Sequence, residues 1–131
     1  MKSDVFDIQG RIAIVTGGLG QIGREFVLEL AERDAQVAIF SRSAGSADLR
    51  DVFSGDALDG GRIIGCDVDI TRKHTIEAGL ARVIERWGAP DILINNAGLD
   101  TQPSAPAEVS GPFEHFPEEV FREVVSVNLT G

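Results

Sequence analysis

A glycine-rich segment near the N-terminus, TGGLGQIG at residues 16–23, constrains the fold of this chain more than any other feature. It follows a continuous apolar run at residues 12–15, which is typical of a strand buried on both faces. It leads into a stretch with helical apolar spacing at residues 21–33. A buried strand, a tight glycine turn and a helix in this order predict one β–α unit of a parallel sheet.

The rest of the chain repeats this alternation of short apolar runs and helical periods. Strands that alternate with helices predict a parallel sheet covered on both faces. We expect further strands at residues 37–40, 62–66 and 92–94, and helices near residues 49–53, over 71–87 and from 117 onward. The pattern predicts an α/β fold, a Rossmann-type doubly wound parallel sheet within one domain over residues 1–131. The expected strand order is 3-2-1-4, with the later strands of that fold missing.

Apolar side chains on one face of each helix are expected to pack against the sheet. Those expected to do so are Ile22, Phe26, Val27 and Leu30 on the first helix, and Ile76, Leu80, Val83, Ile84 and Trp87 on the long helix.

Three residues are predicted to mark helix ends. Thr71 is expected to be the N-cap of the long helix and Gly88 its C-terminal stop. Pro117 is expected to be the first residue of the last helix, where the two glutamates that follow suit the positive end of the helix dipole. Residues 98–116 contain three prolines and no apolar period, which predicts a long loop that is functional or disordered.

The glycine turn has the residues needed to bind the pyrophosphate of a dinucleotide. Gly17 is expected to turn the backbone sharply, Gly20 to let it approach the pyrophosphate, and Gly23 to let the helix pack close to the strand. Free N–H groups and the dipole at the helix start favour phosphate charge. The predicted cofactor-binding turn is completed by Thr16, Gln21 and Ile22. The alternative is a glycine-rich turn with no ligand.

The residues after the second predicted strand indicate which dinucleotide would bind. No Asp or Glu stands there to accept the hydroxyls of the adenosine ribose; the sequence has Ser41 and Arg42 instead. Arg42 can pair with a 2′-phosphate, which favours NADP as the cofactor, with NAD as the second possibility. The alternative is a solvated surface arginine.

Charge, cysteine content and histidine content indicate which partners, location and metal ligands to expect. Lys and Arg number 12 against 21 Asp and Glu, giving a net charge of −9, which argues against nucleic acid and anionic membrane as partners. The single cysteine, Cys66, forms no internal disulfide, which fits a cytoplasmic protein. The sequence has no Cys/His cluster with metal-ligand spacing, so no metal is expected.

The chain resembles the short-chain dehydrogenase/reductase family in motifs that occur in the family's order. They are TGGLGQIG at residues 16–23, CDVD at 66–69, NNAG at 95–98 and VNLTG at 127–131. NNAG is the most specific of them. The turn reads TGxxGxxG, the spacing of the family's extended members, although NNAG and VNLTG are marks of classical members. The resemblance implies an NAD(P)-dependent oxidoreductase that transfers a hydride between nicotinamide and an alcohol or carbonyl substrate.

The resemblance also implies roles for individual residues near the strand ends. Asp67 and Val68 would lie at the adenine, Asp67 through its carboxylate. Asn95 would stabilise the central sheet, and Ala97 and Gly98 would line the cofactor cleft. Simple turn residues are the alternative for Asp67 and Asn95.

Asn128 is the predicted catalytic-site residue of this chain. The resemblance implies that it supports the family's catalytic lysine through a water chain. It lies four residues after Val124 and eight after Val120, so it is expected on their apolar face, where an amide needs hydrogen-bond partners. A satisfied core amide is the alternative interpretation.

The family's catalytic serine, tyrosine and lysine lie beyond the VNLTG motif, and this sequence contains no tyrosine. We therefore expect a chain truncated before the catalytic Tyr and Lys and inactive alone, with no replacement from His74 or His115. The strand at residues 92–94 would then be an open apolar edge, leaving the chain marginally stable or prone to aggregation. Full-length relatives are expected to be homo-oligomers that act on a small alcohol or carbonyl.

Two other interpretations of the whole chain remain open. One is a non-catalytic module that binds a dinucleotide. The other is an interaction protein on a Rossmann scaffold without ligand. Binding of a dinucleotide distinguishes the first from the second.

Overall fold

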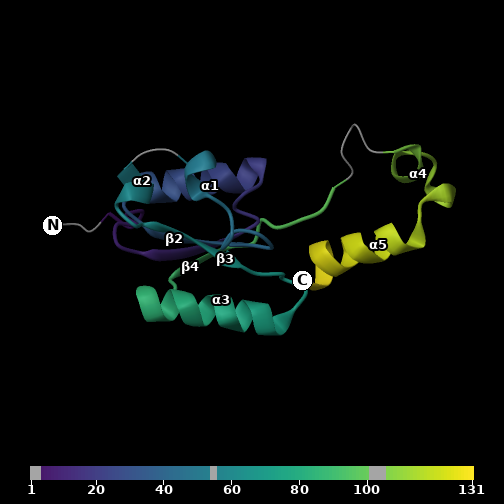
Figure 1. Ribbon diagram of the computed structural model, residues 1–131. Coiled ribbons are helices and arrows are strands. Elements are labelled where there is room, and N and C mark those ends of the chain that lie inside the picture. The colour runs from purple at the N-terminus through teal and green to yellow at the C-terminus, as the bar shows by residue number, and fades with distance from the viewer. Residues whose placement is uncertain (1–3, 54–55, 101–105) are drawn as a thin grey trace.

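The computed structural model describes residues 4–53, 56–100 and 106–131 (Figure 1). Its centre is a parallel four-stranded sheet in the order β3-β2-β1-β4. The strands are β1 (Ile12–Thr16), β2 (Gln36–Ser41), β3 (Ile63–Asp67) and β4 (Ile92–Ile94). Helix α1 (Gln21–Glu32) covers one face and α3 (Lys73–Arg86) the opposite face (Figure 1). The predicted doubly wound sheet and its strand order are confirmed.

Two apolar layers hold the helices on the sheet. Because side chains alternate along a strand, neighbouring residues of one strand enter different layers. Val15 and Ile39 pack on the α1 side with Val27, whereas Ile14 and Phe40 pack on the α3 side. All of β1 is buried, as expected for a central strand with both faces covered.

The buried face of α1 differs from the predicted one. Gly23, Val27 and Ala31 are the buried residues, a stripe at four-residue spacing. Small residues on this stripe let the helix lie close to the sheet, and the apolar face is rotated accordingly. Ile22 is therefore 68% exposed and Phe26 40% exposed, so their predicted burial is wrong.

On α3 the predicted face is largely correct. Val83 is fully buried, and three other predicted residues are half-buried against the same layer: Ile76, Leu80 and Trp87. Ile84 is 49% exposed and lies outside this face. Gly79 takes the remaining central position, where a Cβ would lie 2.7 Å from the side chain of Val68.

Of the predicted helix ends, Gly88 is confirmed. It has φ +113°, and its N–H donates to the carbonyl of Ile84. Arg72, not Thr71, is the N-cap of α3, because Thr71 donates both its N–H and its hydroxyl to the carboxylate of Asp69. Helix α5 (Glu118–Val125) begins one residue after Pro117, which is its N-cap with extended backbone.

The connecting segments contain more local structure than the sequence pattern predicts. The short helix expected near residues 49–53 is a 3₁₀ turn at Leu49–Asp51, followed by α2 (Asp56–Asp59). The described part of the proline-rich loop holds α4 (Ala107–Ser110) and a 3₁₀ turn at Phe113–His115. Its residues 101–105, with Pro103, lie outside the described residues.

The last helix lies beside the sheet, not on one of its faces (Figure 1). The residues that follow it, Ser126–Thr130, form a π-helical turn. No helix in the described part of the chain has the length and apolar character to cross a membrane.

Strand β4 is an open edge of the sheet. Among the described residues it pairs only with β1, and Leu93 at its centre is 60% exposed. The apolar edge predicted from the sequence is therefore present. Unpaired backbone groups beside an exposed apolar side chain are a template for association between chains.

We expect Leu93→Lys to reduce self-association of the chain, because a charged side chain on an edge strand opposes edge-to-edge pairing. The free energy of unfolding should change by less than about 0.5 kcal/mol, since the side chain is exposed. Light scattering over a concentration series measures the effect. Ile84→Lys, at an exposed apolar position on α3, is the control. An equal reduction in that variant would show that general surface apolarity, not the β4 edge, drives association.

Candidate functional site

The candidate site is a cleft at the carboxyl ends of the strands, where ligands bind in open parallel sheets. It consists of two adjoining pockets that share Gly17, Ala97 and Gly98. The turn pocket, about 710 Å³, lies over the glycine turn and the start of α1. The α5 pocket, about 260 Å³, lies between the ends of β2 and β3 and helix α5.

The glycine turn adopts the predicted sharp bend at Gly17. This residue has φ +66°, and its N–H donates to the carbonyl of Phe40 at 2.8 Å. A Cβ on Gly17 would lie 2.9 Å from the Cα of Ala97. The position therefore needs glycine both for its conformation and for the close approach of the segment after β4.

The other glycines of the turn have different roles. A Cβ on Gly20 would meet one described atom within 4 Å, the carbonyl oxygen of Gly17 at 3.3 Å, so space is open above it. A Cβ on Gly23 would collide with that same carbonyl oxygen, so Gly23 fits α1 against the turn. Close contact between turn and sheet comes from Gly18, whose Cβ would lie 2.9 Å from Ile39. This role of Gly18 was not predicted from the sequence.

The start of α1 faces the turn pocket without a side-chain cap. Gly20 is the N-cap and provides no side-chain hydrogen bond, and the next three residues, Gln21, Ile22 and Gly23, line the pocket. The N–H groups of a first helical turn have no partner within the helix. The pocket therefore combines free donors with the positive end of the helix dipole, the combination that binds an anion.

A hydrogen-bond cluster around Thr16 joins the glycine turn to the segment after β4. The buried Thr16 hydroxyl accepts from the N–H groups of Asn96 and Ala97, both at 3.0 Å, and donates to the carbonyl of Ile94. The Asn96 amide donates to the carbonyls of Thr16 at 3.1 Å and Gly17 at 3.2 Å. This cluster fixes the floor shared by both pockets.

In this structure the amide that braces the turn is Asn96, and the sheet-stabilising role of Asn95 stays a prediction. Asn95 is exposed. Strand alternation carried the missed signal, because a period of two places residue 96 on the same side as Ile92 and Ile94, opposite the exposed Leu93.

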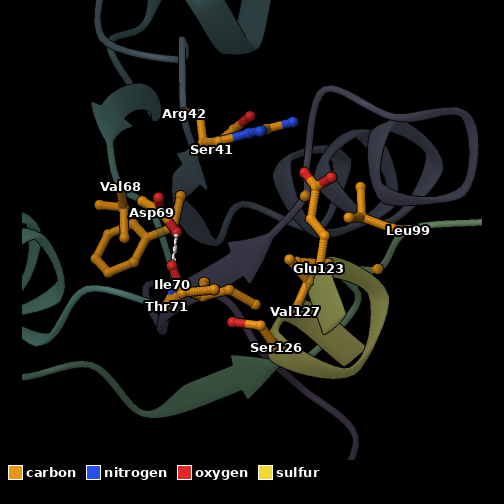
Figure 2. Close-up of a pocket in the computed structure, with 14 residues that line it drawn as sticks. Ser41, Arg42, Val68, Asp69, Ile70, Thr71, Leu99, Glu123, Ser126 and Val127 are labelled. Carbon is orange, nitrogen blue, oxygen red and sulfur yellow. Dashed lines mark hydrogen bonds between the residues drawn. The ribbon is translucent and has the colours of Figure 1, made fainter. Parts of the chain in front are cut away.

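Predicted residues from the ends of β2 and β3 reach the α5 pocket only in part. Ser41, Arg42 and Val68 line it (Figure 2). Asp67 lines neither pocket, since its carboxylate accepts the N–H of Gly45 at 2.8 Å. The structure thus does not bring the Asp67 carboxylate to the position expected for an adenine contact. The next acidic residue, Asp69, lines the pocket instead.

Asp69 is an anionic group of the α5 pocket that was not predicted from the sequence. The hydroxyl of Thr71 donates to its carboxylate at 2.6 Å and the Thr71 N–H at 3.0 Å. These hydrogen bonds hold the pKa of Asp69 below its usual value, so the group is ionised at neutral pH.

Asn128 holds the segment after β4 against the end of α5. Its side-chain oxygen accepts the N–H of Leu99 at 2.7 Å, and its side-chain nitrogen donates to the Leu99 carbonyl at 2.8 Å. The amide therefore has the partners that its position requires, but it is exposed and not in the core. Three residues of this last helical segment, Glu123, Ser126 and Val127, form one wall of the α5 pocket (Figure 2).

The described residues contain no group of three or more His, Cys, Asp or Glu placed to hold a metal ion. Burial raises the pKa of the Cys66 thiol, so this side chain stays protonated within the α3-side layer.

The family profile described as short chain dehydrogenase matches residues 11–131. This chain belongs to the short chain dehydrogenase family. A short chain dehydrogenase/reductase of Aspergillus oryzae is 33% identical over 126 residues, which cover 96% of this chain and 45% of the relative. The 5-keto-D-gluconate 5-reductase of Escherichia coli is 28% identical, over 98% of this chain and 46% of the relative.

A solved structure of the same family has a similar fold. It is the 3-ketoacyl-(acyl-carrier-protein) reductase from Brucella melitensis complexed with NADH, with a TM-score of 0.73 and 27% identity. The match covers 93% of this chain and 46% of that chain. This short chain dehydrogenase sequence thus spans less than half the length of these relatives.

We expect Asn96→Ala to lower the free energy of unfolding by about 1–3 kcal/mol, because the part-buried carbonyls of Thr16 and Gly17 lose their donor. Urea denaturation followed by circular dichroism measures the change. Asn95→Ala is the matched control and should cost less than about 0.5 kcal/mol, since that side chain is exposed. Equal losses in the two variants would contradict the assignment of the bracing role to Asn96.

Proposed function

We propose that this chain forms the NAD(P)-binding part of an oxidoreductase that transfers a hydride between nicotinamide and an alcohol or carbonyl substrate. The observation that carries the proposal is the turn pocket, where the uncapped start of α1 faces open space above Gly20. A pyrophosphate needs backbone donors and an approach that no Cβ obstructs, and this turn provides both. The NADH in the Brucella melitensis relative supports the same class of cofactor.

In this proposal the adenosine lies in the α5 pocket and the nicotinamide beyond the turn pocket. Ser41 and Arg42 would face the adenosine ribose, and Val68 would contact the adenine. Arg42 forms no ion pair with any described residue, so its guanidinium is available to a 2′-phosphate. This supports NADP as the preferred cofactor and NAD as the second.

We further propose that these 131 residues bind the cofactor without turning it over. The sequence contains no tyrosine, the residue expected to act as general acid and base. Asn128 would support the reaction indirectly, by fixing the backbone at Leu99 beside the cleft. A non-catalytic dinucleotide-binding module is the second candidate, because the turn pocket alone would serve it equally well. Cytoplasmic location, homo-oligomers and a small alcohol or carbonyl substrate remain predictions.

We expect Gly20→Val to weaken binding of NADP⁺ and NAD⁺ at least about tenfold while leaving the melting temperature nearly unchanged. The added side chain enters the space above the turn, and the backbone at Gly20 (φ −72°, ψ 171°) accepts any residue. Calorimetric titration measures the affinities, and circular dichroism the melting temperature. Unchanged affinity in a folded variant would contradict pyrophosphate binding at this turn.

We expect Arg42→Ala to reduce the preference for NADP⁺ over NAD⁺ about tenfold, because a charge-assisted hydrogen bond to the 2′-phosphate is lost. NAD⁺ affinity should change little. Arg33→Ala, on the exposed end of α1, removes the same charge away from the cleft and should leave the preference unchanged. If both variants shift the preference equally, Arg42 does not contact the phosphate.

A further inference from the structure

The α5 pocket contains charged groups from three different elements. Arg42 follows β2, Asp69 follows β3, and Glu123 lies on α5. Figure 2 shows the Glu123 side chain rising from the helix into the pocket, toward the rim that carries Arg42. One cation thus shares this small pocket with two carboxylates.

The two carboxylates differ in how far their charge is already compensated. Asp69 accepts two hydrogen bonds from Thr71 and lies 3.5 Å from the guanidinium of Arg72. Glu123 belongs to no ion pair among the described residues, and the neighbouring Arg122 is paired with Glu118. Glu123 is therefore the uncompensated negative charge of the pocket.

This charge acts differently on the two forms of the adenosine ribose. A 2′-phosphate beside Arg42 carries nearly two negative charges and is repelled by a carboxylate on the facing wall. A ribose with free hydroxyls is not repelled, and its hydroxyls can donate to the carboxylate. The sequence has no carboxylate directly after β2 for that purpose, and Glu123 supplies one from the opposite wall of the same pocket.

We propose that Glu123 is a specificity-determining residue of this pocket. It opposes a phosphate beside Arg42 and accepts a ribose hydroxyl of an unphosphorylated nucleotide. The two side chains act in opposite directions, so the chain accepts both forms of the cofactor with a reduced preference. The inference rests on the proposed function, because it assumes that an adenine nucleotide occupies the α5 pocket.

The test uses two probes that differ by one phosphate, adenosine 2′,5′-bisphosphate and adenosine 5′-monophosphate. Calorimetric titration of the 131-residue chain measures both affinities at low salt. Glu123→Gln keeps the side-chain shape and removes the charge. We expect it to tighten binding of the bisphosphate about three- to tenfold relative to the monophosphate, an effect that shrinks at high salt. Glu123→Lys should increase the ratio further.

Glu119→Gln is the matched control, because Glu119 is an exposed residue on the same helix and lines neither pocket. Its ratio of affinities should equal that of the unsubstituted chain. A wild-type ratio in both Glu123 variants overturns the inference, and so does an equal shift in the Glu119 variant, which would reflect net charge alone. If the unsubstituted chain binds neither probe, the proposed function fails and the role of Glu123 fails with it.

Discussion

The hydrogen bonds around Thr16 are the interaction on which the site depends. Thr16 is the last residue of β1 and is buried, so its hydroxyl must find partners within the protein. It finds them in the backbone of Asn96 and Ala97, while the Asn96 amide bonds back to Thr16 and Gly17. This reciprocal arrangement positions the glycine turn and the segment after β4 as one unit. Both pockets are built on that unit, and Asn128 extends it to α5 through Leu99.

Much of the fold could be predicted because its strands and helices have strong periodic signals. A continuous apolar run such as residues 12–15 is typical of a strand buried on both faces of a parallel sheet, and the glycine turn fixes where the first helix begins. Helix faces were predicted less well. Apolar spacing alone predicted that Ile22 and Phe26 face the sheet. The residues of α1 that are buried against the sheet are instead Gly23, Val27 and Ala31. Small residues carry little hydrophobic signal, yet they decide how closely two elements approach.

Less of the site could be predicted, because side-chain direction and local hydrogen bonding decide it. Asn95 and Asn96 are chemically identical, and only strand alternation separates the exposed residue from the one that braces the turn. Asp67 carries the expected carboxylate, but the N–H of Gly45 holds it outside the pockets. Glu123 belongs to no sequence motif, so its place in the site could not be predicted. It enters the site because α5 lies beside the carboxyl ends of the strands, a tertiary arrangement that local sequence does not encode.

The proposed binding of a polyanionic cofactor by this acidic chain must overcome long-range electrostatic repulsion. The net charge of −9 disfavours anions at long range, but salt screens that repulsion over about 8–10 Å. Affinity then depends on groups within contact distance. Backbone N–H groups at the start of α1 provide positive potential at the turn pocket, whose described lining residues include no lysine or arginine. In the α5 pocket the charged groups are side chains, and in our proposal the balance between Arg42, Asp69 and Glu123 decides which phosphate pattern is tolerated.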